Sequence, residues 1–351
     1  CKDQHDKKSA AQKLAKPAFQ HSGGLIHLFF SFVGMEKNAG KTQTLNYVLS
    51  RLRTFSNLKL AISSIGVDGE TLDIVTSTSK PEIEIYPNTT FITSQSLYNQ
   101  KEIVSAIEEV SKDYTALGKL ITARAITQGK VLLGGPSDTK NLKKLLEKLE
   151  KNADLILIDG ALSRKSFGSP TITDAMILST GASLSASLNV VVKKTKFIYQ
   201  MTQLPQYQST LAEQLQNIEN GIYAITEEGI VDLEIPSLMM IDKYKDKIFT
   251  YGTRLFVAGA LNDKFVQLLK IQKNPQEIEI IIKDFTKIFA QEDNVIQYLY
   301  KGGQIKVLDQ TNLIAITANP ISPTGYNFNN EEMLDALRKE IPINIYNVKQ
   351  L

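Results

Sequence analysis

The residues with the clearest capacity for chemistry are Gly34–Thr42, whose sequence is GMEKNAGKT. A loop binds phosphate when its backbone N–H groups point inward, a helix begins behind it and a cation reaches over it. Gly34 allows a sharp exit from a strand, Lys41 can reach the β- and γ-phosphates of a nucleotide, and the Thr42 hydroxyl can bind Mg²⁺. Five residues separate Gly34 from Gly40, where the usual phosphate loop has four.

We interpret this loop as a nucleotide site because a strand pattern precedes it and a helix pattern follows it; a chance Gly-Lys-Thr is the alternative. Asn319-Pro320 also follows a strand pattern, and ligands of α/β sheets bind at such ends, although an ordinary Asn-Pro turn fits equally. The predicted nucleotide-binding residues are Gly34, Glu36, Lys37, Asn38, Ala39, Gly40, Lys41, Thr42, Gln43 and Asn319.

Two acidic residues are predicted to complete the site. Asp159 ends the apolar run LILID, the form of a strand whose carboxylate holds Mg²⁺ or its water shell. Asp68 follows the second predicted strand, with Glu70 and Asp73 close behind, and a solvated acidic turn is the alternative there. We therefore predict Lys41, Asp68 and Asp159 as catalytic and Thr42, Asp68 and Asp159 as metal ligands.

Three further basic residues could act near this site. Lys80 lies in a hydroxyl-rich stretch, residues 76–85, of the kind found in switch or substrate loops. Arg164 and Lys165 follow Asp159 closely and could meet phosphate oxygens or a partner, although a solvated turn explains them as well.

The elements around these residues alternate between strand and helix patterns. Residues 25–33 form a near-continuous apolar run, and Leu45, Val48, Leu49 and Leu52 then form one helical stripe. Further strands are predicted at 58–66, 153–161 and 174–183, a hairpin at 82–94 around Pro87-Asn88, and a helix at 95–112. Such alternation predicts an α/β fold with a mostly parallel sheet flanked by helices.

The length of 351 residues favours two domains. We predict an N-terminal extension without regular structure at 1–23, a nucleotide-binding domain at 24–205 and a smaller α/β domain at 206–351. The boundary is placed at Pro205-Gln206, where the strand and helix pattern changes.

Composition excludes several classes of protein. A net charge of +3 gives no reason to expect nucleic acid as a partner. One cysteine and three histidines argue against disulfides and against a Cys- or His-based metal centre. No apolar run reaches the roughly 20 residues that span a bilayer, so we expect a cytoplasmic protein that does not enter the membrane. The oligomeric state stays open, with a homodimer among the options.

The spacing of the loop, with Glu36 two residues after Gly34, resembles that of dethiobiotin synthetase. That enzyme belongs to a class of P-loop proteins that includes signal-recognition GTPases and MinD-like ATPases. In MinD-like members a signature lysine stands near the start of the loop; here Glu36 occupies that place and Lys37 comes one position later. This departure argues against a MinD-type dimeric mechanism.

Four blocks together resemble the reactivase-type accessory proteins of lysine 5,6-aminomutase: GMEKNAGKTQTLNY, SSIGVDGETLDIVTSTSKPEI, LILIDGALSRKSFGSP and DAMILSTGAS. The resemblance implies an ATP-dependent chaperone that reactivates an adenosylcobalamin-dependent aminomutase by exchanging its damaged cofactor. The loop residues Lys41 and Thr42 themselves predict ATP or GTP and Mg²⁺ as cofactors. ATP is favoured because the chain has no Asn-Lys-x-Asp guanine signature.

Two other functions stay open on the sequence. One is an ATP-dependent ligase that activates a small carboxylate, with Lys80 or Arg164 holding the anion. The other is a nucleotide-sensing protein without turnover.

Overall fold

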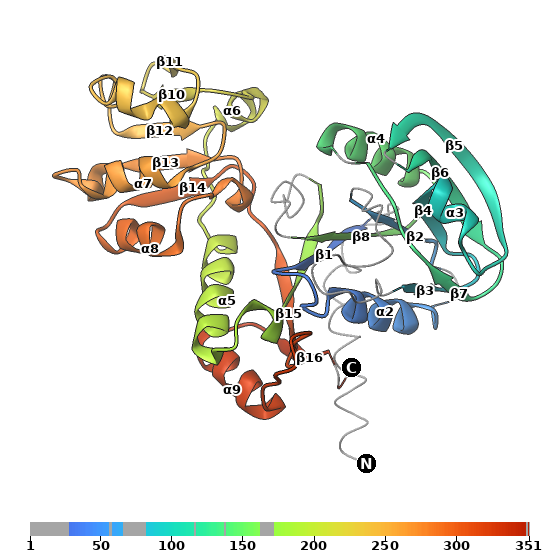
Figure 1. The fold of residues 1–351 in the computed structure, drawn as a ribbon. Coiled ribbons are helices and arrows are strands. Elements are labelled where there is room, and N and C mark those ends of the chain that lie inside the picture. The colour runs from blue at the N-terminus through green and yellow to red at the C-terminus, as the bar shows by residue number, and fades with distance from the viewer. Residues whose placement is uncertain are drawn as a thin grey trace. The chain divides into compact units, whose positions relative to one another are not determined.

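The computed structural model describes residues 28–55, 58–65, 82–115, 117–136, 138–161, 172–348 and 350. They form two compact units (Figure 1). The first unit takes its described residues from the stretches Cys1–Phe167, Ile172–Val191 and Leu313–Leu351, and the second from Val192–Asn312. Among the described residues, no helix is long and apolar enough to cross a membrane.

The first unit is built on a nine-stranded sheet in the order β16-β15-β9-β1-β8-β2-β4-β6-β5. The strands from β16 to β4 are parallel, and β6 and β5 are antiparallel additions at one edge. The strands of this sheet are β1 (Leu28–Gly34), β2 (Leu60–Ser64), β4 (Thr90–Ser94), β5 (Ser105–Thr115), β6 (Gly118–Ala125), β8 (Leu155–Ala161), β9 (Ala175–Gly181), β15 (Leu313–Asn319) and β16 (Ile345–Asn347). The predicted α/β fold with a mostly parallel sheet is confirmed.

Helices cover both faces of this sheet (Figure 1). The helices of the first unit are α2 (Lys41–Leu52), α3 (Gln95–Asn99), α4 (Thr139–Leu149), η1 (Ala182–Leu184) and α9 (Asn330–Glu340). Helix α5 (Leu188–Thr202) begins in the first unit and continues into the second from Val192. On one face Leu45 and Leu49 of α2 pack with Phe32 and Leu157, and on the other Leu142 of α4 packs in a second cluster. The predicted stripe on α2 is therefore the core-facing side of that helix.

The second unit has a five-stranded sheet in the order β11-β10-β12-β13-β14, in which β12, β13 and β14 are parallel. Its strands are β10 (Ile222–Ile225), β11 (Ile230–Ile235), β12 (Arg254–Val257), β13 (Glu279–Ile282) and β14 (Gln304–Val307). Its further helical elements are α6 (Ala212–Asn217), η2 (Leu238–Tyr244), α7 (Asp263–Lys270), η3 (Pro275–Glu277), η4 (Phe285–Lys287) and α8 (Glu292–Tyr300).

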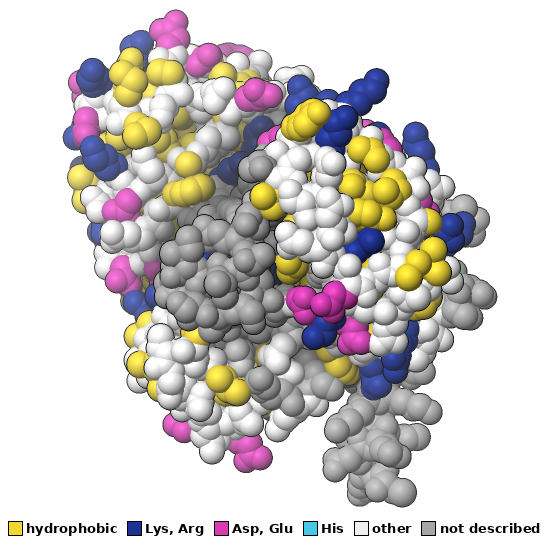
Figure 2. All heavy atoms as spheres, turned by 45° about the vertical axis from the view of Figure 1, so that its right-hand side comes forward, with side chains coloured by type: hydrophobic (Ala, Val, Ile, Leu, Met, Phe, Trp, Pro, Cys, Tyr) yellow, Lys and Arg dark blue, Asp and Glu magenta, His cyan; other side chains and the backbone are white. Residues whose placement is uncertain are grey.

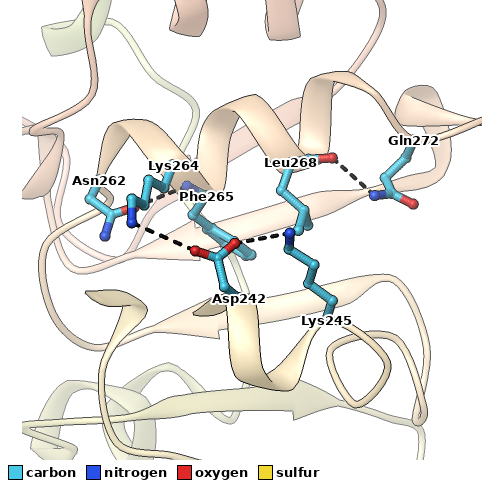
Figure 3. A network of polar contacts seen from close by, with 7 residues as sticks. All are labelled: Asp242, Lys245, Asn262, Lys264, Phe265, Leu268 and Gln272. Atoms are coloured by element: carbon cyan, nitrogen blue, oxygen red, sulfur yellow. Dashed lines mark hydrogen bonds and ion pairs between the residues drawn. The ribbon is translucent and has the colours of Figure 1, made fainter. Parts of the chain in front are cut away.

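Polar contacts tie η2 to α7 in the second unit (Figure 3). Asp242 lies between Lys245, at 2.9 Å, and Lys264 of α7, at 3.6 Å. Asn262 caps α7 by accepting a hydrogen bond from the Phe265 N–H at 2.9 Å. A side-chain cap of this kind satisfies one of the free N–H groups at a helix start.

The predicted division at residue 205 is wrong for the C-terminal part of the chain. Residues 313–351 belong to the first unit, where β15 pairs with β9 and β16 pairs with β15. The apolar run of β15 is typical of any buried parallel strand, so its sequence does not reveal which sheet it joins. The predicted extension at 1–23 lies outside the described residues.

Two local predictions are also wrong. The helix expected at 95–112 stops at Asn99, and Ser105–Thr115 is instead strand β5, paired with β6. The turn at Pro87-Asn88 exists, with Asn88 at a φ of 68°, but its flanking strands do not pair. The short strand β3 (Ile83–Ile85) pairs with β7 (Gly129–Val131), whereas β4 pairs with β2 and β6.

Candidate functional site

The loop between β1 and α2 has a strained backbone that only certain residues allow. Asn38 has a φ of 60° and Gly40 a φ of 93°, both in the left-handed region. A Cβ at Gly40 would lie 2.8 Å from Val348 Cγ2 and 3.1 Å from Asn319 Cβ. Gly40 is therefore required both by its conformation and by the close approach of the C-terminal segment.

The start of α2 leaves donors without helical partners. The first hydrogen bond of the helix runs from the Thr44 N–H to the Gly40 carbonyl at 3.0 Å, and Gly40 has no side chain to cap the turn. The N–H groups of Lys41, Thr42 and Gln43 thus have no acceptor within the helix. Together with the positive end of the helix dipole, they form a setting that favours an anion.

Lys41 and Asp159 form an ion pair beside this loop. Their Nζ and Oδ1 atoms are 2.8 Å apart, and their side chains are 22% and 13% exposed. The pair forms because β1 and β8 are parallel neighbours, with Phe32 opposite Asp159, so that both strands end at the same edge. Asp159 Oδ1 is buried and, among the described residues, accepts no hydrogen bond apart from this ion pair.

A third strand ends at the same place. Ser64 of β2 lies opposite Asp159, and the Ile65 N–H donates to the Asp159 carbonyl at 3.0 Å. A Cβ at Gly135 would lie 1.6 Å from the Ser64 carbonyl oxygen, so the chain at Gly135 crosses directly against the end of β2. The carboxyl ends of β1, β8 and β2 therefore converge on Lys41 and Asp159, as expected for a ligand site in an α/β sheet.

The loop is braced by residues from the other end of the chain. Asn319 donates through Nδ2 to the Asn38 carbonyl at 2.9 Å and accepts through Oδ1 from the Ile321 N–H at 3.2 Å. Both sides of its amide are thus engaged in holding the loop and the turn after β15. The predicted nucleotide contact by Asn319 stays a prediction, and its bracing of the loop is an additional role.

A buried chain of hydroxyls, which the sequence did not reveal, supports the first turn of α2. The hydroxyls of Thr44 and Thr317 are 2.8 Å apart, and those of Thr317 and Ser179 are 2.9 Å apart. Thr44 Oγ1 also donates to the Gly40 carbonyl at 3.1 Å. A hydroxyl residue near the carboxyl end of β9 and of β15 is the sequence signal for this chain of hydroxyls. Serine and threonine are common at strand ends, so the signal is weak.

The other predicted loop residues differ in exposure. Glu36, Lys37 and Gln43 are exposed, Thr42 is half-buried and the Ala39 side chain is in the core at 1% exposure. Asn38 Nδ2 is buried and has no hydrogen-bond partner among the described residues.

Part of the predicted site lies outside the described residues. This applies to Asp68, Glu70, Asp73, Lys80, Arg164 and Lys165. Of the predicted metal ligands, the structure describes Thr42 and Asp159, and within the described ranges no group of three or more His, Cys, Asp or Glu side chains could hold a metal ion.

Comparison with protein-family models, curated proteins and solved structures gives no match for this chain.

Proposed function

We propose that the chain binds and hydrolyses a nucleoside triphosphate, with Gly34–Thr42 as its phosphate loop. The observation that carries the proposal is the Lys41–Asp159 ion pair beside the open start of α2. A lysine at the start of a helix and a carboxylate near the end of the adjacent strand are two of the charged groups that phosphate-loop enzymes use for phosphoryl transfer.

Each residue has a role in this proposal. Lys41 exchanges its partner Asp159 for phosphate oxygens, and the free N–H groups of Lys41, Thr42 and Gln43 donate to the same oxygens. The Thr42 hydroxyl and the released Asp159 carboxylate are the described groups that would hold Mg²⁺, whose charge would neutralise the phosphates. Asp159 fits this role because its buried Oδ1 has only the ion pair to satisfy it.

The resemblance of the loop and strand blocks supports a more specific function. We propose that the nucleotide is ATP and that the chain reactivates an adenosylcobalamin-dependent aminomutase. Nucleotide state would then change the affinity of the chain for the mutase, as differential binding requires. A small-carboxylate ligase and a nucleotide sensor without turnover make different predictions for the same assay.

The test of the loop is nucleotide binding by calorimetry with ATP and Mg²⁺. We expect Lys41→Ala to weaken binding by about 100-fold or more, because the loop loses its cation. The matched control is Lys143→Ala, an exposed lysine of α4, which should bind as the wild type does. Asp159→Asn should retain binding while hydrolysis falls by about 100-fold. Unchanged binding by Lys41→Ala would refute the phosphate loop.

The test of the biological role is a steady-state ATPase assay with three additions. Slow turnover stimulated by an aminomutase supports the reactivase. Turnover that requires a small carboxylic acid supports the ligase and excludes the reactivase. Tight binding without turnover under either condition supports the sensor.

A further inference from the structure

Strand β5 is an edge strand of unusual length. It has 11 residues, it is the last strand of the nine-stranded sheet, and β6 pairs with one side of it. Within the described ranges no strand pairs with its other side, which therefore presents a row of backbone donors and acceptors. Such an edge is a template for pairing with another chain. Figure 1 shows β5 at the outside of the first unit.

An apolar stripe runs along this strand on one face of the sheet. Ile107, Val110 and Tyr114 lie opposite Ala123, Ile121 and Lys119 of β6, so their side chains share a face. They are 51%, 49% and 75% exposed. Figure 2 turns this side of the unit towards the viewer and shows hydrophobic side chains gathered among Lys and Arg. Exposed apolar side chains on one face beside an open sheet edge are typical of an interface.

The sequence of β5 is complementary to itself when the strand is reversed. In an antiparallel pair with a two-fold axis through Val110, residues equally spaced before and after it lie opposite each other. Glu108 of one copy then faces Lys112 of the other, twice in the dimer. The register of β5 against β6 shifts between Ile107 and Glu109 and again between Val110 and Tyr114. In the reversed pair of two β5 strands, the first irregular stretch of one copy therefore lies opposite the second irregular stretch of the other.

We infer that two copies of this chain pair through β5 into one continuous sheet, with a two-fold axis at Val110. The stripe of one copy continues into that of the other: Val110 meets Val110, and Tyr114 follows the residue that lies opposite Ile107. A symmetric interface requires one surface to complement itself, and the Glu108 and Lys112 charges on either side of Val110 meet that requirement. An unrelated partner would not require this symmetry, so the charge pattern favours a second copy.

The first test is sedimentation velocity of the full chain over a range of micromolar concentrations. We expect a monomer–dimer equilibrium in the wild type. Val110→Lys should raise the dissociation constant of the dimer at least about tenfold, because it places two lysines together at the axis. Met239→Lys is the matched control, since Met239 is 82% exposed but lies in η2 of the second unit, and it should leave the equilibrium unchanged. A monomeric wild type, or equal effects of the two variants, would overturn the inference.

The second test reads the register itself. Glu108→Lys and Lys112→Glu should each weaken self-association, because like charges then face each other across the axis. An equimolar mixture of the two variants should recover the wild-type dimer, since each new charge meets its opposite in the other copy. Glu108→Lys also removes a contact with Arg124 at 3.0 Å in its own chain, but mixing cannot repair that loss. A mixture as weak as its components would refute this register.

Discussion

Gly40 occupies a position where backbone conformation and surrounding space both exclude a side chain. Gly40→Ala should lower the free energy of unfolding of the first unit by roughly 2–4 kcal/mol, because a left-handed alanine is strained and its Cβ also meets Val348. Gly325 is the matched control: its φ is 94° and nothing lies within 4 Å of its Cβ position. Gly325→Ala should cost about 1–2 kcal/mol by strain alone. Urea denaturation measures both, and equal losses would show that contact at Gly40 is unimportant.

The candidate site could be predicted only where its signals are local in sequence. Lys41 and Asp159 each carry a recognisable short pattern, a loop that opens a helix and an apolar strand that ends in an acid. Thr317 contacts Thr44 of α2 across 273 residues of chain, and Asn319 contacts Asn38 of the loop across 281 residues. Nothing near Thr317 or Asn319 in sequence indicates these contacts. Prediction from residue types therefore finds the charged groups and singles out Asn319 as a nucleotide contact, but it misses the brace that Asn319 forms and the hydroxyls of Thr317 and Ser179.

Strand β5 shows the same limit at the scale of an element. The stretch 95–112 is predicted as one helix, but only Gln95–Asn99 is helical and Ser105–Thr115 is a strand. The strand conformation of Ser105–Thr115 depends on its pairing with β6, which places Ile107 and Val110 opposite apolar residues of that strand. The buried parallel strands β1 and β9 could be predicted from sequence. Their apolar runs lack the polar face that an amphipathic helix would require.

The first turn of α8 carries an acid whose titration should be visible in stability. Burial is the main reason why the pKa of the Glu292 carboxyl is raised. The positive charges of Lys193 and Lys194 lower this pKa, and the negative charge of Asp293 raises it. The folded state therefore binds a proton more tightly than the unfolded chain, so this group favours folding below its unfolded pKa. That contribution is lost as pH rises through the raised, folded pKa. Glu292→Gln should thus stabilise the second unit at pH 7, by less than about 1 kcal/mol.

Thermal unfolding between pH 3 and pH 8 tests this sign. The stabilisation by Glu292→Gln should shrink as pH falls into the carboxyl range, where the wild-type group is already protonated. Asp293→Asn is the matched control in the same turn, and it should destabilise slightly because Asp293 pairs with Lys193 at 2.7 Å. A Glu292→Gln effect that does not change with pH would contradict the prediction.

At the scale of the whole molecule, length alone favours two units, but sequence does not show that the first is discontinuous. The segment 192–312 stands between β9 and β15, which are adjacent strands of one sheet. Strands and helices continue to alternate from the second unit into residues 313–351, so the pattern contains no signal for the return to the first sheet. Assigning 206–351 as a single domain was the natural reading of that continuity, and it was wrong.

The discontinuity predicts the behaviour of a truncated chain. A fragment of residues 24–205 lacks β15 and β16, so β9, whose seven residues are all buried, would become an exposed edge. We expect this fragment to be insoluble or to melt without a cooperative transition, because an apolar strand without its neighbour favours aggregation. Circular dichroism and limited proteolysis against the full chain provide the measurement. Cooperative unfolding of the fragment at the temperature of the full chain would contradict this expectation.

The brace between Asn319 and the loop also has a consequence for biosynthesis. A ribosome makes Asn319 281 residues after Asn38, so the nascent chain carries the loop over that stretch of synthesis without the residue that braces it. The contacts of Asn38 with Asn319 and of Thr44 with Thr317 have a high contact order, and such contacts close late in folding. The loop can therefore be braced only after the chain has been made as far as Thr317 and Asn319.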